Sequence, residues 1–301
     1  MQRIKTIAQL RDLLRPQRER QLGLVPTMGS LHEGHLSLIR QAAAECEQVV
    51  VSVFVNPLQF GPDEDLDRYP RNLERDCQLA EEAGADLVFA PGVEEMYPGE
   101  GKTTVRVAGL TDRLCGASRP GHFDGVATVV SKLFHIVEPD RAYFGQKDAQ
   151  QAAVIQQMVR DLNLPVQIIT CPTVREENGL ALSSRNVYLT PEEKRQATTL
   201  YQTLREATRE REAGRLCQAE EAVQFIRERL EQTAGLSIDY VEVLSYPGLE
   251  PLERLDDSPS IAAVAVYLGS TRLIDNVIWP KRREEDVPHP DEIQNPPSYR
   301  N

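Results

Sequence analysis

The 301-residue chain is poor in cysteine, in tryptophan and in long apolar runs, and each shortage excludes a class of protein. Its five cysteines are scattered and form no C-x-x-C pair, so neither a disulfide framework nor a zinc knuckle fits. The longest apolar runs, near Val49–Val55 and Ile261–Leu268, have the length of a strand and not the ~20 residues of a membrane span. The first residues carry charges and no apolar segment of the kind found in secretion signals. We therefore expect a cytoplasmic protein with free thiols.

Positive charge is also in short supply. There are 34 Lys and Arg residues against 46 Asp and Glu residues, which gives a formal net charge of −12. Nucleic acids and anionic membranes are polyanions, so this balance argues against both as partners. The hydrophobic content of 41% and the charged content of 27% are those of globular proteins and exclude wholesale disorder. The length favours one large domain with a smaller one.

The first part of the chain alternates short β-branched runs with stretches of helical spacing. Such alternation with short connections predicts a Rossmann-like parallel α/β sheet with right-handed crossovers. Ligands of such sheets bind beyond the carboxyl ends of the strands, so the loops at Pro26, Asn56 and Gly145 are the expected places for chemistry. The predicted strands are Leu22–Pro26, Gln48–Val55, Asp86–Ala90, Arg141–Phe144 and Val166–Cys171.

The pattern changes after the segment TPEE at residues 190–193, which begins a helix with Thr as its cap and Pro at its first position. Two charged helices, near residues 192–213 and 217–233, precede strands near residues 238–244, 261–268 and 273–278. We therefore predict three parts: a Rossmann-like catalytic domain over residues 1–186, a smaller α+β domain over 187–280, and a tail over 281–301. Prolines crowd in the last part and apolar periodicity vanishes, as in a disordered tail or linker.

The segment from Pro26 to His35 (PTMGSLHEGH) carries the most chemical information. It follows a predicted strand and opens a helix, where free backbone N–H groups and the helix dipole favour phosphate. His32 and His35 are three residues apart and face the same side of a first helical turn. We interpret them as donors of hydrogen bonds to nucleotide phosphates. Two alternatives stay open: ordinary histidines at a helix start, and a metal pair, although the zincin spacing places its two histidines four positions apart.

This segment resembles the HIGH-type signature of the nucleotidyltransferase superfamily, in the form carried by the pantothenate synthetase (pantoate–β-alanine ligase) family. Further blocks in the same order carry the resemblance over about 165 residues. The sequence departs from the family pattern at Gln146, where many members have Glu, at Leu182, where Met is common, and at Arg75, where some carry a second acid. The blocks are VNPLQF (55–60), RPGHFDGV (119–126), FGQKD (144–148) and LSSRN (182–186).

The resemblance implies an ATP-dependent ligase that joins pantoate and β-alanine through a pantoyl adenylate. Lys147 is the implied main cation for the phosphates, and Ser183, Ser184 and Arg185 resemble the family's counterpart of the synthetase K-M-S-K-S loop. His32 and His35 complete the implied catalytic set. The implied ATP contacts are Met28, Gly29, His32, His35, Gly145, Lys147, Asp148, Val174, Leu182, Ser183 and Arg185.

The implied contacts for pantoate and β-alanine are Gln59, Gln151, Asn56, Met28, Phe60 and Arg119. Amide side chains suit an acid with two hydroxyls because they both donate and accept hydrogen bonds. The family also implies that Mg²⁺ arrives with ATP, with Asp76 beside it, that the smaller domain acts as a lid, and that the protein is a homodimer. The alternative is another HxGH-type nucleotidyltransferase. We further expect a local positive island made of His32, His35, Arg119, Lys147 and Arg185.

Overall fold

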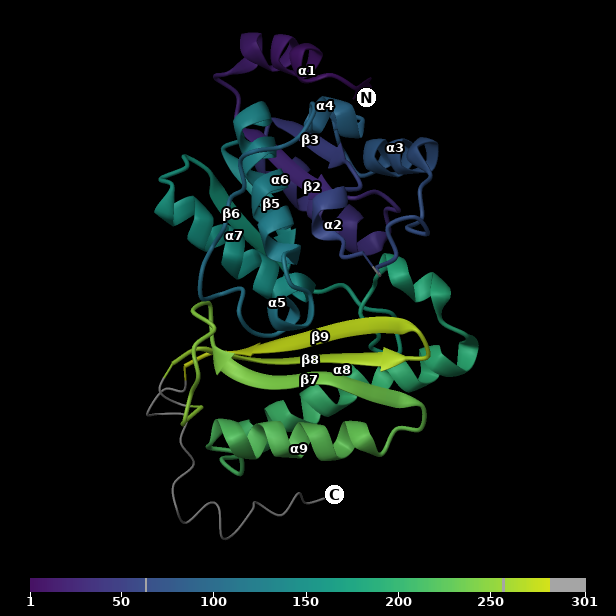
Figure 1. Cartoon of the computed structure of the whole chain (residues 1–301), viewed down its shortest axis with the longest axis vertical. Coiled ribbons are helices and arrows are strands. Elements are labelled where there is room, and N and C mark those ends of the chain that lie inside the picture. The colour runs from purple at the N-terminus through teal and green to yellow at the C-terminus, as the bar shows by residue number, and fades with distance from the viewer. Residues whose placement is uncertain (63, 256–257, 282–301) are drawn as a thin grey trace, which may run out of the picture. The chain divides into compact units, whose positions relative to one another are not determined.

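A computed structural model describes residues 1–62, 64–255 and 258–281, so the predicted tail lies outside the described residues except for Lys281. The chain forms two compact units (Figure 1). The first unit contains Met1–Arg175 and the short segment Leu182–Ser184. The second contains Glu176–Ala181 and the described residues from Arg185 onward. The backbone therefore passes between the two units three times around residues 175–185.

The first unit is built on a six-stranded parallel sheet with the order β1-β4-β3-β2-β5-β6. Its middle strands consist almost wholly of buried residues, as expected for strands covered on both faces. The chain builds β3 and β4 on one side of β2 and then returns to build β5 and β6 on the other side, so the topology switches between β2 and β5. The strands are β1 (Gln2–Ile4), β2 (Leu22–Thr27), β3 (Gln48–Val53), β4 (Leu87–Phe89), β5 (Arg141–Gly145) and β6 (Gln167–Cys171).

Helices cover both faces of this sheet. One hydrophobic cluster joins α2 and α3 to alternate residues of the strands, including Val25 and Val51. The intervening residues Leu24 and Val50 are also fully buried, which requires cover on the opposite face. There α6 packs against β2, α1 and α7. The helices are α1 (Ile7–Leu14), α2 (Glu33–Glu45), α3 (Leu73–Glu82), α4 (Val93–Met96), α5 (Cys115–Ser118), α6 (His122–Val137) and α7 (Ala149–Asp161), with short 3₁₀ turns η1 (Arg15–Gln17), η2 (Pro57–Gln59) and η3 (Gln146–Asp148).

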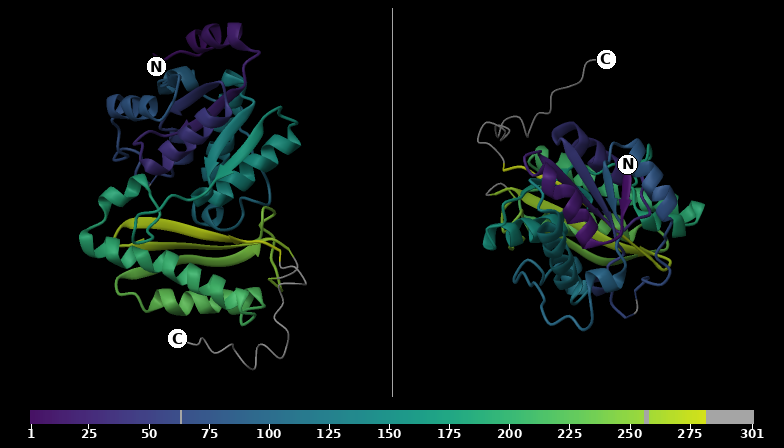
Figure 2. Two further views of the ribbon diagram at one scale, coloured as in Figure 1. Left: turned by 180° about the vertical axis from the view of Figure 1, so that it is seen from behind. Right: turned by 90° about the horizontal axis from the view of Figure 1, so that it is seen from above.

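The second unit is a three-stranded antiparallel sheet, β7-β8-β9, with two helices on one of its faces (Figures 1 and 2). Helices and strands contribute to a single hydrophobic cluster that contains Leu204, Ile226, Val264 and Trp279. As the TPEE motif predicts, Thr190 caps α8 and exchanges hydrogen bonds with Glu193 in a capping box. The elements are α8 (Pro191–Glu212), α9 (Ala219–Glu231), β7 (Leu236–Ser245), β8 (Ser260–Leu268) and β9 (Thr271–Trp279), preceded by η4 (Ser184–Tyr188).

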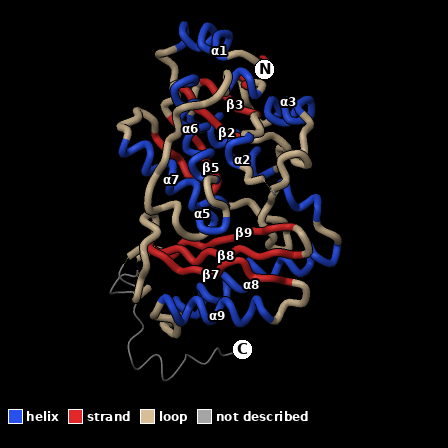
Figure 3. Tube along the Cα trace, in the orientation of Figure 1, coloured by secondary structure: helices blue, strands red, loops and turns tan. Residues whose placement is uncertain are grey.

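The predicted fold class is confirmed: a Rossmann-like parallel sheet is followed by an α+β part (Figure 3). Each predicted strand overlaps an observed one, and the differences are confined to the ends. The prediction missed β1, which has three residues and pairs in parallel with β4 at the sheet edge. Within the described residues no helix combines the length and the apolar character needed to cross a membrane.

Candidate active site

The loop between β2 and α2 is held by a buried carboxylate from α3. Asp76 is 2% exposed, and its two oxygens accept hydrogen bonds from the backbone N–H groups of Ser30 (2.9 Å) and Leu31 (2.7 Å). Gly29 lies at a φ of +82°, and a Cβ added there would be 2.9 Å from Asp76 Oδ2. The loop therefore requires glycine at this position and an acceptor with two oxygens beneath it.

His32 and His35 form a reciprocal capping box at the start of α2. His32 Nδ1 accepts a hydrogen bond from Gly34 N (3.2 Å), and His35 Nδ1 accepts one from His32 N (3.4 Å). The two rings lie against each other with centroids 4.1 Å apart and their planes tilted by 39°. Since a backbone N–H can only donate, Nδ1 carries no proton in either ring and the proton lies on Nε2. Both imidazoles thus have an Nε2–H donor at a helix N-terminus, as hydrogen bonding to phosphate requires.

The two histidines are neutral at physiological pH. Burial, with a smaller repulsion from Lys147, lowers the pKa of His32 to about 4. Burial, with contributions from His32 and Lys147, lowers the pKa of His35 to about 3. The influence of Lys147 on both rings, and of Asp148 on His32, places the loop after β5 beside the loop after β2. These are the loops on either side of the topological switch point, where such sheets bind ligands.

The segment 182–184 lies against the same loop. Ser184 Oγ donates a hydrogen bond to Ser30 O (3.3 Å), and Leu182 N donates one to Val174 O (3.0 Å) beyond β6. A Cβ added to Gly34 would be 3.8 Å from the Leu182 Cβ. The loop between β2 and α2, residues 28–32, is called the histidine loop below. The structure thus brings Val174, Leu182 and Ser184 to this loop within the first unit, and Ser183 lies between Leu182 and Ser184. Arg185 belongs to the second unit.

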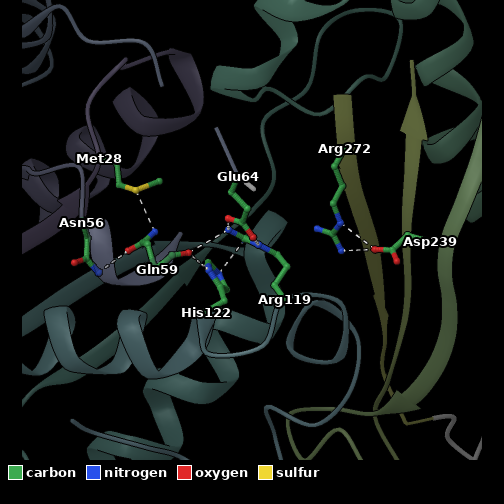
Figure 4. A network of polar contacts seen from close by, with 8 residues as sticks. All are labelled: Met28, Asn56, Gln59, Glu64, Arg119, His122, Asp239 and Arg272. Atoms are coloured by element: carbon green, nitrogen blue, oxygen red, sulfur yellow. Dashed lines mark hydrogen bonds and ion pairs between the residues drawn. The ribbon is translucent and has the colours of Figure 1, made fainter. Parts of the chain in front are cut away.

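Asn56 caps the turn η2 that follows β3, and Gln59 is the last residue of that turn; both are buried, at 1% and 8% exposure. Asn56 Nδ2 donates to Gly125 O and to Gln59 Oε1, both at 3.1 Å. Asn56 Oδ1 accepts from Leu58 N (3.3 Å) and from the Tyr97 hydroxyl (2.8 Å). All four hydrogen-bonding positions of the Asn56 amide are therefore used inside the protein. Gln59 Nε2 is left facing Met28 Sδ at 3.1 Å (Figure 4).

Arg119 is an ion-paired residue that supports the backbone of Gln59. Its guanidinium contacts both carboxylate oxygens of Glu64, the backbone oxygen of Gln59 and His122 Nε2 (Figure 4). Burial raises the pKa of the Glu64 carboxyl, but its hydrogen bonds with Arg119 outweigh this effect and hold that pKa below its ordinary value. His122 Nδ1 also contacts Gln59 O at 2.8 Å, so the neutral ring donates from Nδ1 and accepts at Nε2. Burial, followed by Arg119, lowers the pKa of His122 to about 4.

The predicted positive island is therefore wrong for three of its five groups. His32 and His35 are neutral, because desolvation outweighs any stabilisation of the imidazolium. Arg119 has its charge balanced by Glu64, and its contacts leave one of five N–H groups for a ligand. Its predicted contact with pantoate or β-alanine stays a prediction.

The remaining predicted residues lie around the same edge of the sheet. Gly145 is the last residue of β5, and a Cβ added there would meet no described atom within 4 Å. Gln151 is the third residue of α7 and is half-buried. Phe60 stacks edge-to-face on Tyr69 with centroids 5.9 Å apart. Their roles in holding ATP or pantoate stay predictions.

Asp76 is the weakest fit to its predicted role beside Mg²⁺. Each of its oxygens already holds a backbone N–H, and no group of three His, Cys, Asp or Glu side chains suited to a metal occurs among the described residues. Mg²⁺ is commonly bound by one or two carboxylates together with substrate phosphates, so ATP would supply the other ligands. The contact of Asp76 with Mg²⁺ stays a prediction, and what the structure shows is support of the histidine loop.

Sequence reasoning missed the supporting residues Tyr97, Glu64 and His122 and the loop-holding role of Asp76. Glu64 and Arg119 are 55 positions apart in the chain, and Asp76 lies 46 positions after Ser30, so no local spacing links them. His122 could have been singled out because it lies in the RPGHFDG block.

A Rossmann-like sheet with a histidine-capped helix at its carboxyl edge defines a nucleotide-binding α/β protein. Comparison with known proteins narrows this class. The sequence model of the family described as Pantoate-beta-alanine ligase matches residues 2–278, and the chain belongs to this family.

Individual relatives agree over nearly their whole lengths. The pantothenate synthetase of Acetivibrio thermocellus is 56% identical over 280 residues, which are 92% of this chain and 99% of that protein. The crystal structure of pantothenate synthetase from Thermus thermophilus is similar with a TM-score of 0.87 at 50% identity, covering 92% of this chain and 99% of that one. The pantoate-beta-alanine ligase of Francisella tularensis, complexed with beta-gamma ATP and beta-alanine, has a TM-score of 0.76 at 35% identity, covering 92% and 97%.

Proposed function

We propose that the protein is an ATP-dependent ligase that condenses pantoate with β-alanine to pantothenate and releases AMP and pyrophosphate. The observation that carries the proposal is the histidine pair: two neutral rings with their protons on Nε2, at the N-terminus of α2 and beside Lys147. Family membership supplies the acid and the amine.

In the first step a carboxylate oxygen of pantoate attacks the α-phosphorus of ATP, and the bond from this phosphorus to the oxygen that leads to the β-phosphate breaks. A carboxyl group with a pKa of about 4 is already ionised at neutral pH, so this step requires no general base. It requires in-line placement and stabilisation of the charge that moves onto the leaving pyrophosphate. His32 and His35 serve this purpose by donating hydrogen bonds from Nε2 without transferring a proton, and Lys147 supplies the positive charge.

In the second step the amine of β-alanine attacks the acyl carbon of pantoyl adenylate. The new C–N bond forms as the C–O bond to AMP breaks. AMP leaves with that electron pair, and the nitrogen gives up its extra proton to solvent. Gln59 and Gln151 hold the pantoate part through both steps, with Met28 and Phe60 beside its methyl groups. Ser183, Ser184 and Arg185 follow the phosphate oxygens as the charge moves.

The proposal extends to the metal ion, the role of the second unit and the oligomeric state. ATP enters as its Mg²⁺ complex, and the second unit acts as a lid that excludes water from the labile adenylate. We keep residues 1–186 as the proposed catalytic domain and 187–280 as the proposed lid domain, bounds that differ from those of the two compact units at residues 176–181 and 185–186. We further propose that the protein works as a homodimer in the cytoplasm. Sedimentation at micromolar concentration tests the dimer, which a monomer mass would refute.

The test of the proposed function is a reaction with defined components. The purified protein is mixed with ATP, Mg²⁺ and pantoate, β-alanine is then added, and AMP is followed. Steady AMP release that requires both acids supports the ligase. Transfer of the nucleotide to a different acceptor, with no requirement for β-alanine, would instead identify another nucleotidyltransferase of this superfamily.

A further inference from the structure

Backbone groups identify which atom of the Asn56 amide is the nitrogen and which is the oxygen. Gly125 O can only accept a hydrogen bond, so the atom facing it at 3.1 Å is the Nδ2 donor. Leu58 N can only donate, so the atom facing it at 3.3 Å is Oδ1. The amide is therefore assigned without ambiguity, which is uncommon for asparagine.

Asn56 in turn orients the amide of Gln59. The second proton on Asn56 Nδ2 points to Gln59 at 3.1 Å, so that atom of Gln59 is the acceptor Oε1. Nε2 then faces Met28 Sδ, a weak acceptor, at 3.1 Å. A substrate oxygen would be a stronger acceptor than this thioether. Gln59 thus presents an N–H group, and the matching group on the substrate is an acceptor oxygen.

The hydroxyl of Tyr97 is the stronger of the two restraints on Asn56 Oδ1. Its 2.8 Å contact is shorter than the 3.3 Å contact of Leu58 N. Burial raises the pKa of Tyr97 to about 12, so the hydroxyl keeps its proton for donation at neutral pH. Tyr97 directly follows α4 and packs its ring near Phe54, with centroids 6.0 Å apart.

We propose that Tyr97 is a positioning residue for the acid substrate: its hydroxyl holds Asn56, and Asn56 holds the Gln59 amide with its N–H toward the substrate oxygen. Tyr97 itself does not contact the reacting groups in this scheme. The inference rests on the proposed function, since pantoate is the acid that Gln59 would hold. It also assigns Asn56 to orientation rather than to direct contact with the substrate.

Tyr97→Phe tests the proposal because it removes the hydroxyl and keeps the ring contact with Phe54. Initial rates are measured with pantoate and ATP varied separately. We expect the KM for pantoate to rise about five- to tenfold, the scale of one neutral hydrogen bond, while kcat and the KM for ATP change less than about twofold. An unchanged KM for pantoate, or an equal rise for both substrates, would overturn the proposal.

Tyr143→Phe is the matched control. Tyr143 is also buried, and its hydroxyl donates to Glu45 Oε2 (2.9 Å) and contacts Cys46 Sγ (3.3 Å), at the far end of α2 from the histidines. This variant loses a buried hydroxyl without touching Asn56, so the KM for pantoate should stay unchanged. A rise equal to that of Tyr97→Phe would mean that general loosening explains both.

A double substitution separates positioning from a purely structural role. In a Gln59→Ala background there is no amide to orient, so adding Tyr97→Phe should leave kcat/KM for pantoate unchanged within about twofold. A full additional loss in that background would refute action through Gln59. The unsubstituted protein provides the reference: if it does not turn over pantoate, the proposed function fails, whereas normal turnover with an unaffected Tyr97→Phe variant overturns only this inference.

Discussion

Replacement of Asp76 by Asn tests whether this carboxylate holds the histidine loop. The substitution keeps the shape of the side chain but replaces one acceptor oxygen by an NH₂ group. Either Ser30 N–H (2.9 Å) or Leu31 N–H (2.7 Å) must then face a donor instead of an acceptor. A hydrogen bond to a charged group contributes about 1.5–3 kcal/mol, and the abandoned N–H, which is buried at Leu31 and part-buried at Ser30, lies beside a side chain that is 2% exposed. We expect the loop to lose about 2–3 kcal/mol, or about 30- to 150-fold in its opening equilibrium.

The assay is amide hydrogen exchange of peptides that cover residues 28–36, on the free protein with EDTA and no nucleotide. These conditions remove any contribution from Mg²⁺, so the measurement isolates the contact with the loop. Peptides from β8 in the second unit report whether the effect is local. The exchange of the loop should accelerate by the factor given above.

Glu74→Gln is the control, because Glu74 is an exposed acid in the same first turn of α3 and makes the same change in charge. It should leave exchange of the loop unchanged. If Asp76→Asn also leaves it unchanged while the KM for MgATP rises, the loop-holding role is refuted and a role at the metal is favoured.

Three further outcomes are expected. His35→Ala and Lys147→Ala should each lower the rate of AMP formation by at least ~100-fold with an unchanged circular dichroism spectrum, and near-normal rates in either would show that the site is assigned wrongly. The free energy of unfolding should fall as the pH drops from about 6.5 to about 4, because unfolded histidines take up protons in this range while His32, His35 and His122, with pKa values of about 4, 3 and 4, take up few. Urea titrations across this range measure the change, and a flat profile would contradict it. Gly125→Ala should lower the melting temperature although Ala favours a helix interior, because its Cβ would lie 2.2 Å from Leu58 O; a rise in melting temperature would contradict the contact.

The sheet could be predicted because its middle strands carry a strong local signal. The run QVVVSV of β3 is rich in valine and buried on both faces, as expected for a strand between two helix layers. The three residues of β1 are too few to show a period, and their place at the edge depends on pairing with β4, far along the chain. The prediction therefore succeeded for strands whose residues are buried on both faces of the sheet. It failed for the strand that is defined only by its pairing with a distant segment.

The candidate site likewise has features that a local sequence pattern predicts and features that depend on distant segments. Strand-end loops could be anticipated because parallel strands gather their carboxyl ends at one edge, and His32 and His35 share a helical turn. Their charge state could not be anticipated, since it depends on burial that distant segments provide. The charge of Arg119 looked available for a substrate because its partner Glu64 is 55 positions away.

The contacts of Asn56 also affect its susceptibility to deamidation. Asparagine side chains deamidate when the backbone nitrogen of the following residue attacks the side-chain carbonyl, and here that residue is Pro57, whose nitrogen carries no proton. All four hydrogen-bonding positions of the amide are also taken inside the fold. Conversion to aspartate would replace the Nδ2 donor by an acceptor and invert the Gln59 amide. The residue that sets the orientation of the Gln59 amide is thus protected against deamidation by its neighbour Pro57 and by its own hydrogen bonds.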